Sequence, residues 1–408
     1  MTMRETRPSA WRHLAGRLGV ELTIAIILFA TLRLLLSTFA ALVAMYVDPP
    51  GPCHQELAFA DWDAFPRMES GAVSFPLFGV WQRWDACWYI KIASFGYVPG
   101  ENATAFFPLY PAITRVLGLG LGGSFTVAGL IASAIAYVVA MVGLLRLVAA
   151  ETGRPTAVRA ALYLSIFPSA FFLFAPFTEA LFLASVVWAL WGARQGRWGV
   201  SALAGLAAAL TRTHGVLLVL PVAWEAARWA RSRWRPAQGA APRPMMDLAP
   251  PALAVLAPLA GFGAFSVYAT AVMGQSPADA QGYWGGANFH PPWEVLAAAI
   301  TWSLERGDAM ELINVGMLLF AGVMLVPIFR RLPLAYGLYA LPHVAVMATR
   351  ILPTPLTSTS RFVLVIFPIF MVLAIWGRHP WVHHAWIVGS ALLLGFLTYL
   401  FVIGDFVA

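Results

Sequence analysis

Charged residues are scarce in this sequence. Of its 408 residues only 11% are charged, whereas 60% are hydrophobic. A soluble domain usually carries about 25% charged residues, so the composition excludes an ordinary soluble protein. Apolar runs of about 18 residues or more recur along the chain, and each is long enough to cross the hydrocarbon core of a bilayer, which is about 30 Å thick. The sequence therefore predicts an all-α protein that crosses a membrane many times.

Lysine and cysteine are almost absent. Lys91 is the single lysine, so arginine supplies nearly all of the positive charge behind the net charge of +7. Most arginines lie in short segments between apolar runs, which is typical of cytoplasmic loops and does not indicate nucleic acid binding. The two cysteines, Cys53 and Cys87, are too few for a zinc site of their own. Both fall in a segment predicted to lie outside, where disulfides persist, and whether they pair stays open.

The distribution of arginine orients the predicted spans. The arginine-rich leading segment is predicted to lie inside, and the first apolar run, about 20–47, is too long for a cleavable signal peptide. The segment 48–123 has no apolar run of spanning length and is rich in acidic residues, so it is predicted to be a large outer loop with interfacial helices. We expect one transmembrane domain over 1–408, with about ten spans and a second outer loop over 275–308. The later spans are predicted near 124–148, 156–173, 177–193, 248–273, 309–329, 334–348, 362–376 and 386–403.

The segment 200–227 is predicted to form a re-entrant helical hairpin. A single crossing would put the arginines that follow it on the outside, against the positive-inside rule. Two arms of about 13 residues, roughly 20 Å of helix each, are too short to cross alone. Arg212 and His214 would lie at the tip, and such a break survives in a membrane only where it faces protein or a wet cavity. The following arginines are Arg228, Arg231, Arg233, Arg235 and Arg243.

A tryptophan-rich stretch in the first outer loop holds the most informative carboxylate. Trp81, Trp84 and Trp88 recur at three- and four-residue spacing, which predicts one helical stripe at the membrane–water boundary. Asp85 and Tyr89 share a neighbouring face of that helix. A carboxylate held there can accept a proton from a sugar hydroxyl, although an interfacial helix with a solvated aspartate explains the same pattern.

Several motifs resemble those of the PIG-V family, which contains the second mannosyltransferase of GPI-anchor synthesis and its bacterial relatives. The family belongs to the GT-C class of polytopic transferases. The similar motifs are Trp84-Asp85, Trp88-Tyr89, Ile92-Ala93, Gly96-Tyr97, Ala105-Phe106-Phe107-Pro108-Leu109-Tyr110-Pro111, Pro168-Ser169 with Thr178-Glu179, Thr211-Arg212-Thr213-His214-Gly215, and Ser360-Arg361-Phe362 with Pro368. His214 stands where the family pattern has asparagine, which leaves the role of the hairpin tip open.

The resemblance implies transfer of a hexose, first of all mannose, from a polyprenyl-phosphate donor. The acceptor would be a lipid-linked compound or a glycan on the extracytoplasmic face of a bacterial cytoplasmic membrane. We expect Asp85 to be the general base of an inverting reaction. Arginine suits a leaving phosphate because its hydrogen bonds can be bidentate, so Arg361 is the first choice for this role, followed by Arg212. Lys91 is a third candidate, although a snorkelling surface lysine is the better explanation of this residue.

Other residues are assigned supporting roles. An ion pair between Arg212 and Glu179 is the alternative to phosphate binding by Arg212. The second outer loop is expected to choose the donor sugar. The predicted supporting or acceptor-binding residues are Trp84, Tyr89, Tyr110, Glu179 and His214, and those of the second outer loop are Tyr283, Trp284, Asn288 and His290.

Two other functional interpretations remain. One is a transferase of the same class with a protein acceptor or another sugar, and the other is a multispan transporter of lipid or sugar. The sequence shows no internal repeat, which disfavours a transporter. No Gly-rich phosphate loop occurs, and we expect no metal or other cofactor beyond the lipid-linked donor substrate.

Several other polar residues have the composition or spacing of a functional site. Asp61-Trp62-Asp63 spells a metal-binding pattern of soluble glycosyltransferases, but it lacks the aromatic context that follows Asp85. The trio of His379, His383 and His384 has metal-like spacing in a short predicted inner loop without an acidic partner. Arg33, in the middle of the first span, either faces the site or makes a structural pair.

Overall fold

The computed structural model describes residues 10–47, 49–53, 74–234, 245–283, 289–351 and 354–407. Within these residues the regular structure is helical, and one isolated β-bridge pairs Phe289 with Arg350. The all-α prediction is confirmed over this part of the chain.

Five helices of the described chain are long and apolar enough to cross a membrane, so the protein is a multi-pass membrane protein. The apolar window of α5 is 67% buried, against 28% in α10 and α13. Helix α5 therefore lies at the centre of the bundle. Helices α10 and α13 present apolar side chains outward, as lipid-facing helices do. The five are α1 (Ala10–Val47), α5 (Phe125–Thr152), α10 (Ala249–Met273), α13 (Ala309–Arg331) and α17 (Pro380–Ile403).

Shorter helices complete the bundle. The predicted span over 156–173 is wrong as a continuous helix, because α6 ends at Ser165 and a separate 3₁₀ turn follows. The predicted span over 362–376 is likewise interrupted before Pro368, which cannot continue a helix because it lacks a backbone N–H. The shorter helices are α6 (Arg154–Ser165), η5 (Ala170–Leu173), α7 (Glu179–Arg194), α8 (Trp198–Thr211), α9 (Val219–Trp234), α14 (Leu334–Ala348), α15 (Thr359–Leu364) and α16 (Pro368–Trp376).

The two predicted outer loops contain short helices. The described helices of the first loop are α2 (Ser74–Leu77), η3 (Gly79–Trp81), α3 (Asp85–Phe95), η4 (Ala103–Ala105) and α4 (Leu109–Gly120), and those of the second are α11 (Pro277–Tyr283) and α12 (Pro292–Arg306).

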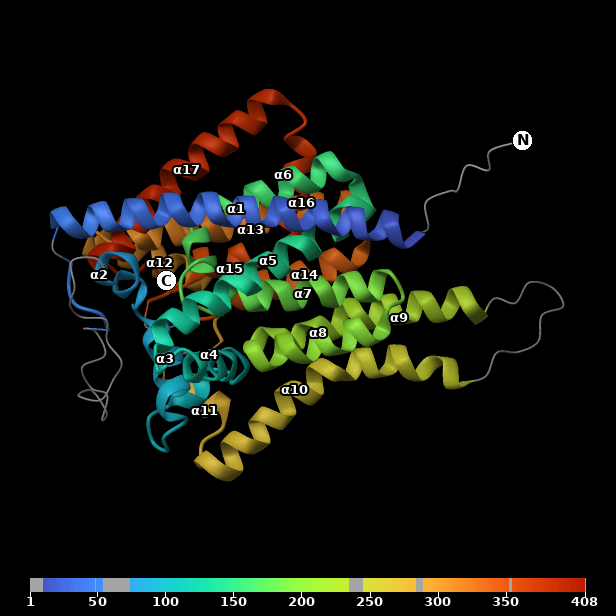
Figure 1. The fold of residues 1–408 in the computed structure, drawn as a ribbon, viewed down its shortest axis with the longest axis horizontal. Helices are drawn as coiled ribbons and strands as arrows, with labels where there is room; N and C mark the ends of the chain where they lie inside the picture. The colour runs from blue at the N-terminus through green and yellow to red at the C-terminus, as the bar shows by residue number, and fades with distance from the viewer. Residues whose placement is uncertain are drawn as a thin grey trace, which may run out of the picture.

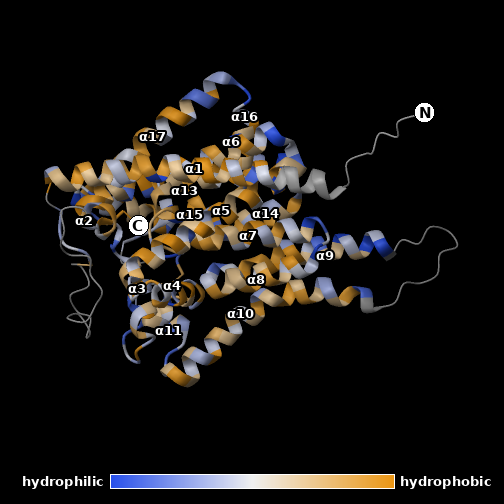
Figure 2. Cartoon of the chain, in the orientation of Figure 1, coloured by the Kyte–Doolittle hydropathy of each residue, from blue (hydrophilic) through white to orange (hydrophobic). Residues whose placement is uncertain are grey.

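The bundle has two distinct ends. Figure 1 shows α2, α3, α11 and the C-terminus at one end, which we call the α3 end. The start of α1, the end of α9 and the start of α10 lie at the opposite end, which we call the α9 end. Hydrophilic residues gather toward both ends, and hydrophobic ones along the helices between them (Figure 2). The described part of the first outer loop and the arginine-rich end of α9 therefore lie at opposite ends of the bundle.

The hairpin over 200–227 is present as two antiparallel helices. Helix α8 ends where Arg212 adopts an extended backbone, with φ −153° and ψ 149°, and η6 (Thr213–Leu218) leads into α9. The ring of Trp198, at the start of α8, contacts the ring of Trp229 in α9 with centroids 5.7 Å apart. A Cβ at Gly215 would lie 2.3 Å from the backbone of Ala208, so this turn requires glycine.

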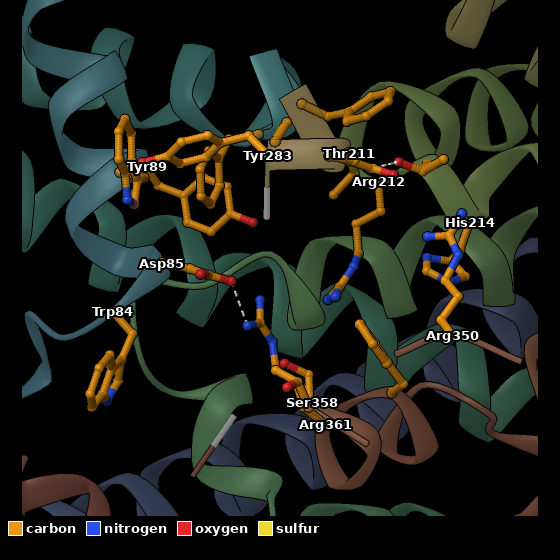
Figure 3. Close-up of a pocket in the computed structure, with 18 of the residues that line it drawn as sticks. Trp84, Asp85, Tyr89, Thr211, Arg212, His214, Tyr283, Arg350, Ser358 and Arg361 are labelled. Carbon is orange, nitrogen blue, oxygen red and sulfur yellow. Dashed lines mark hydrogen bonds and ion pairs between the residues drawn. The ribbon is translucent and has the colours of Figure 1, made fainter. Parts of the chain in front are cut away.

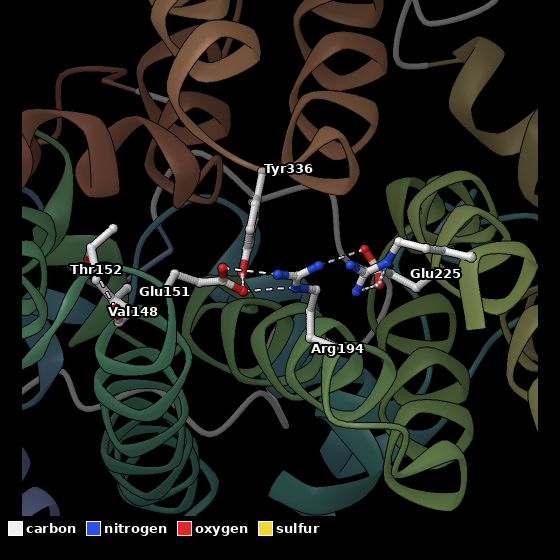
Figure 4. Close-up of polar contacts among 7 residues, drawn as sticks. Val148, Glu151, Thr152, Arg194, Glu225 and Tyr336 are labelled. Atoms are coloured by element: carbon white, nitrogen blue, oxygen red, sulfur yellow. Dashed lines mark hydrogen bonds and ion pairs between the residues drawn. The ribbon is translucent and has the colours of Figure 1, made fainter. Parts of the chain in front are cut away.

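A network of ion pairs joins four helices at the α9 end (Figure 4). Arg194 of α7 donates to Glu151 of α5 at 2.8 and 3.0 Å, and to Glu225 of α9 at 3.1 Å. Tyr336 of α14 donates its hydroxyl to Glu151 at 2.9 Å, and Arg228 pairs with Glu225 at 2.6 Å. Each carboxylate has a positive partner, which removes most of the penalty of burying it.

Candidate active site

A cavity of about 610 Å³ lies at the α3 end of the bundle. Its walls come from α3, from the tip of the α8–α9 hairpin, from α11 and from the segment 357–362 (Figure 3). The charged side chains and the hydroxyls gather on two sides, and aromatic rings fill much of the remainder. The charged and imidazole side chains of the lining are Asp85, Arg212, His214, Arg350 and Arg361, and the aromatic ones are Trp84, Trp88, Tyr89, Phe106, Phe107, Tyr283, Phe362 and Phe406.

The turn that places Asp85 is held from several sides. Cys53 and Cys87 form a disulfide, with Cα atoms 5.8 Å apart, and thereby tie residues 49–53 to the first turn of α3. The backbone N–H of Cys53 donates to the carbonyl of Gln82 at 3.0 Å. Trp84 has a positive φ of 52°, a conformation that costs a bulky residue about 1–3 kcal/mol and persists only where its surroundings enforce it. The sequence did not decide whether Cys53 and Cys87 pair; in the structure their disulfide helps to hold the turn that positions Asp85.

Arg83 adds a further tether to this turn. Its guanidinium donates to the carbonyl of Gly51 at 2.6 Å and to that of Val402, at the end of α17, at 3.2 Å. The N-terminus of α3 is thus attached to the first outer segment and to the last helix of the described chain.

Two carboxylates and two arginines form one connected network in the cavity wall. Glu179, the first residue of α7, is fully buried and accepts hydrogen bonds from both Arg212 and Arg361. Arg361 also donates through Nη1 to Oδ2 of Asp85 at 2.5 Å. The network is neutral overall, since two negative groups face two positive ones. Charges buried to this extent are tolerated when they are paired and hydrogen-bonded in this way.

The loop before α15 is fixed so that Arg361 faces this network. Ser169 donates its hydroxyl to the carbonyl of Ser360 at 2.8 Å, and Asn314 of α13 accepts from the Ser360 backbone N–H at 3.3 Å. Glu311, also in α13, accepts from the backbone N–H of Leu356 at 2.6 Å. These contacts fix α15, the short helix that carries Arg361, against α13 and Ser169.

Asp85 and Tyr89 differ in their capacity to accept a proton. The Asp85 side chain is 33% exposed, and its Oδ1 makes no hydrogen bond with any described residue. Tyr89 is buried, and its hydroxyl lies 3.3 Å from that of Thr178. Burial, and secondarily the charge of Asp85, raises the pKa of Tyr89 to about 12. The phenol therefore stays protonated at neutral pH, which leaves Asp85 as the candidate base in this wall.

The structure brings most of the predicted site residues together. Glu179 lies directly behind the lining, in contact with both arginines. Tyr110 is buried outside the cavity, donates to the carbonyl of Gly129 at 2.8 Å, and packs against the ring of Tyr89 with centroids 5.4 Å apart. The predicted residues that line the cavity are Trp84, Asp85, Tyr89, Arg212, His214, Tyr283 and Arg361.

Lys91, a third predicted phosphate-binding residue, lies outside the lining of the cavity. It is buried, does not line the cavity, and pairs with Glu101 at 2.5 Å. Its ammonium also lies 5.7 Å from the centroid of the Trp88 ring. Glu101 therefore neutralises this charge away from the cavity.

Arg350, just after α14, is a charged residue of the lining that the sequence motifs did not indicate. Its guanidinium lies 5.3 Å from the ring centroid of Phe289, and it makes no ion pair with a described carboxylate. The backbone N–H of His290 donates to the carbonyl of Thr349 at 2.8 Å, which attaches the second outer loop to the end of α14. An arginine on the predicted outer side runs against the positive-inside tendency, and that signal could have identified it.

The remaining sequence candidates have structural roles or fall outside the description. Arg33 donates to the carbonyl of Phe174 at 2.8 Å and lies 5.0 Å from the Trp81 ring centroid, so it makes a structural contact. Within the described ranges no three His, Cys, Asp or Glu side chains form a group that could hold a metal ion. His290 does not line the cavity. Asp61, Asp63, Trp284 and Asn288 lie outside the described residues.

This fold is similar to that of the solved structure of ArnT. ArnT from Cupriavidus metallidurans, solved with bound undecaprenyl phosphate, matches with a TM-score of 0.50 and 16% identity, over 90% of this chain and 63% of that chain. The oligosaccharyltransferase of Archaeoglobus fulgidus matches with a TM-score of 0.41 and 12% identity, over 95% of this chain and 53% of that chain. The chain thus spans less than two thirds of the length of ArnT, and it has the helical-bundle fold of the GT-C glycosyltransferases.

The family follows from the sequence. The model of the mannosyltransferase (PIG-V) family matches residues 20–225, which is half of the chain, and the protein belongs to that family. The matched range contains Asp85, Glu179 and Arg212, whereas Arg350 and Arg361 lie beyond it. No curated protein matches the sequence significantly.

Proposed function

We propose that this protein transfers mannose from a polyprenyl-phosphate donor to a lipid-linked or glycan acceptor, with inversion at the anomeric carbon. The observation that carries the proposal is a partly exposed carboxylate, Asp85, that shares one cavity wall with Arg361 and Arg212. Membership of the PIG-V family supports the sugar, and the apolar surroundings support a lipid-linked donor rather than a nucleotide sugar.

The proposed chemistry needs one proton acceptor and stabilisation of one leaving group. The hydroxyl oxygen of the acceptor attacks the anomeric carbon while its proton passes to Asp85. The bond from the anomeric carbon to the phosphate oxygen breaks on the opposite face, and the electron pair leaves with the polyprenyl phosphate. The donor is a singly charged diester and the leaving group is a monoester with one more ionisable oxygen, so negative charge develops at the phosphate.

The ion pair between Asp85 and Arg361 couples these two events. When Asp85 takes the proton it becomes neutral, and Arg361 loses part of its compensation. The positive charge that is released can stabilise the charge that develops on the phosphate, with no net change of charge in the cavity. Arg212 contributes hydrogen bonds to the phosphate, because its Nε and Nη2 have no partner among the described residues.

The same proposal orients the molecule. The α3 end would face the extracytoplasmic side of a bacterial cytoplasmic membrane, and the arginine-rich α9 end the cytoplasm, as the positive-inside rule requires. The α8–α9 hairpin, with arms of 14 and 16 residues, would then re-enter the membrane and place Arg212 at the depth of the donor phosphate. Trp84 and Trp88 would lie at the membrane–water boundary.

The test is mannose transfer by the purified protein from a synthetic polyprenyl-phosphate mannose to a panel of glycolipid acceptors. Asp85→Asn should lower kcat by about 10²–10⁴-fold, because it removes the general base. Asp405→Asn is the matched control, an exposed aspartate near the C-terminus that does not line the cavity, and Asp63→Asn tests the rejected motif. Full activity in Asp85→Asn would overturn the assignment of the base. Transfer only from another sugar donor, or only to a protein, would correct the substrate and leave the mechanism intact.

A further inference from the structure

We propose that Arg350 binds the phosphate of the donor and makes the cavity selective for a singly charged phosphodiester over a diphosphate. This inference rests on the proposed function and adds a residue that determines substrate specificity. Figure 3 places Arg350 and His214 on the side of the cavity opposite Trp84 and Asp85. The cavity therefore has one side that holds the base and another that holds an additional cation.

The charges around the cavity carry the argument. Arg212 and Arg361 are neutralised by Glu179 and Asp85, so these four residues present no net charge to a ligand. Arg350 is the third arginine of the lining, and no described carboxylate pairs with it. With histidine counted as neutral, three arginines face two carboxylates, which leaves a single positive charge to attract an anion.

The surroundings of Arg350 suit a phosphate. Its Nε is buried and has no hydrogen-bond partner among the described residues, so a donor group of the guanidinium is left unsatisfied. Ser358 and Thr357 bring hydroxyl groups to the same lining. A second, smaller cavity of about 50 Å³ is lined by Arg350, His214 and Thr357 as well, so the polar region extends beyond the main cavity.

The number of uncompensated charges indicates the kind of phosphate. A sugar joined to a polyprenol through one phosphate is a diester with one negative charge, which the free charge of Arg350 balances. A diphosphate-linked sugar carries about two, and the second would have no cation of its own in a cavity that is largely apolar. Guanidinium also binds phosphate oxygens through paired hydrogen bonds, which an ammonium cannot do with the same geometry.

Equilibrium binding in detergent tests this inference without requiring transfer. The ligands are a short-chain polyprenyl-phosphate mannose, the matching diphosphate, and the uncharged polyprenol mannoside. We expect wild type to bind the monophosphate most tightly. Arg350→Gln should weaken that binding by about 10- to 100-fold, the usual range for one charge-assisted hydrogen-bonded contact, and leave the uncharged mannoside unaffected. Arg350→Lys should recover part of the affinity, because it restores the charge without the planar donor group.

Arg306→Gln is the matched control. This arginine lies at the end of α12, its guanidinium is 3.7 Å from the ring centroid of Trp302, and it does not line the cavity. The substitution Arg306→Gln therefore removes the same charge from a similar arginine–aromatic contact. Thermal unfolding of each variant in the same detergent identifies any variant that has lost its fold, and Arg350→Lys then supplies the comparison.

The outcomes separate this inference from the proposed function. Unchanged binding of the monophosphate by Arg350→Gln, or tighter binding of the diphosphate by wild type, would overturn the inference even if mannose transfer depends on Asp85. The expected binding pattern in a wild type that transfers no mannose would support the phosphate site and contradict the proposed sugar. Inorganic phosphate that competes as well as the lipid ligand would show that the site does not recognise a lipid-linked diester.

Discussion

Two networks of carboxylates and arginines lie at opposite ends of the same bundle. At the α3 end Asp85 and Glu179 pair with Arg361 and Arg212, and at the α9 end two glutamates pair with two arginines. The members of the second network are Glu151, Glu225, Arg194 and Arg228. Both networks are neutral and both join helices that are distant in sequence. The composition of such a network therefore does not by itself define an active site.

The networks differ in what surrounds them. The network at the α3 end borders a cavity of about 610 Å³, and its Asp85 is partly exposed there. The opposite side of the same cavity is lined by Arg350, which pairs with no described carboxylate. At the α9 end the groups bridge helices, and Tyr336 supplies an additional hydrogen bond to Glu151. None of these residues lines the large cavity. We infer that the first network takes part in chemistry and the second stabilises the bundle.

The largest effect should come from comparing one carboxylate of each network. Asp85→Asn should reduce kcat by about 10²–10⁴-fold with little change in unfolding temperature, since the side chain is partly exposed. Glu225→Gln should do the reverse, lowering the unfolding temperature while kcat of the folded fraction is unchanged. Transfer assays and thermal unfolding on the same preparations make the comparison. A loss of kcat in Glu225→Gln equal to that in Asp85→Asn would remove the distinction between the networks.

Glu179→Gln should affect both activity and stability. The change leaves Arg212 and Arg361 without their shared buried partner, and removing one member of a buried ion pair costs about 3–5 kcal/mol. We expect a lower unfolding temperature together with weaker binding of the donor. Denaturation curves and donor titrations measure the two effects separately. A variant that keeps wild-type stability would show that the two arginines find other partners.

The disulfide between Cys53 and Cys87 should affect only the α3 end. It joins residues 34 positions apart, and a loop of this length is worth about 3–4 kcal/mol in the chain-entropy model. The double variant Cys53→Ser/Cys87→Ser should lower kcat and make the first outer loop more sensitive to protease, without loosening the α9 end. Reduction of wild type by dithiothreitol is the parallel test. Unchanged kcat and proteolysis after complete reduction would mean that other contacts suffice to place Asp85.

The smallest effect is expected from Tyr336→Phe. The hydroxyl makes one hydrogen bond to Glu151, and its loss should cost about 0.5–1.5 kcal/mol of stability. The ion pairs of Glu151 with Arg194 remain, so the rate of mannose transfer should be unchanged. Thermal unfolding and initial rates measured side by side test this point. A clear fall in rate would show that the α9 end communicates with the cavity.

Local properties of the sequence account for the elements that were predicted well. Long apolar runs predicted α1, α5, α10, α13 and α17, because the hydropathy that makes a helix suitable for lipid is a property of consecutive residues. The charge distribution predicted that the chain folds back within 200–227, where α8 and α9 run antiparallel, and the re-entrant position of this hairpin in a membrane stays a prediction. The tryptophan spacing correctly predicted a helix that contains Asp85, but the single stripe was wrong, because Trp81 and Trp84 lie before the start of α3. The helix breaks after Ser165 and before Pro368 were missed, because apolar composition continues through both.

The contacts between distant residues could not be derived in this way. Asp85 and Arg361 are 276 positions apart. Arg212 pairs with Glu179 because the fold brings the tip of the α8–α9 hairpin to the start of α7, and the sequence alone did not indicate this contact. Lys91 and Glu101 are closer, but nothing in their spacing indicated that they would pair.

By itself the sequence determined that the chain is a helical membrane protein, that it resembles the PIG-V family, and that Asp85 is its most informative carboxylate. Only the tertiary structure decided which charges neutralise one another and which remain available to a ligand. The physical reason is that hydropathy and helical periodicity act over a few neighbouring residues, whereas the net charge of a cavity depends on every side chain that the fold brings to it. Arg350 is an example: its proposed role depends on the absence of a carboxylate partner among the described residues, which no local pattern of the sequence indicates.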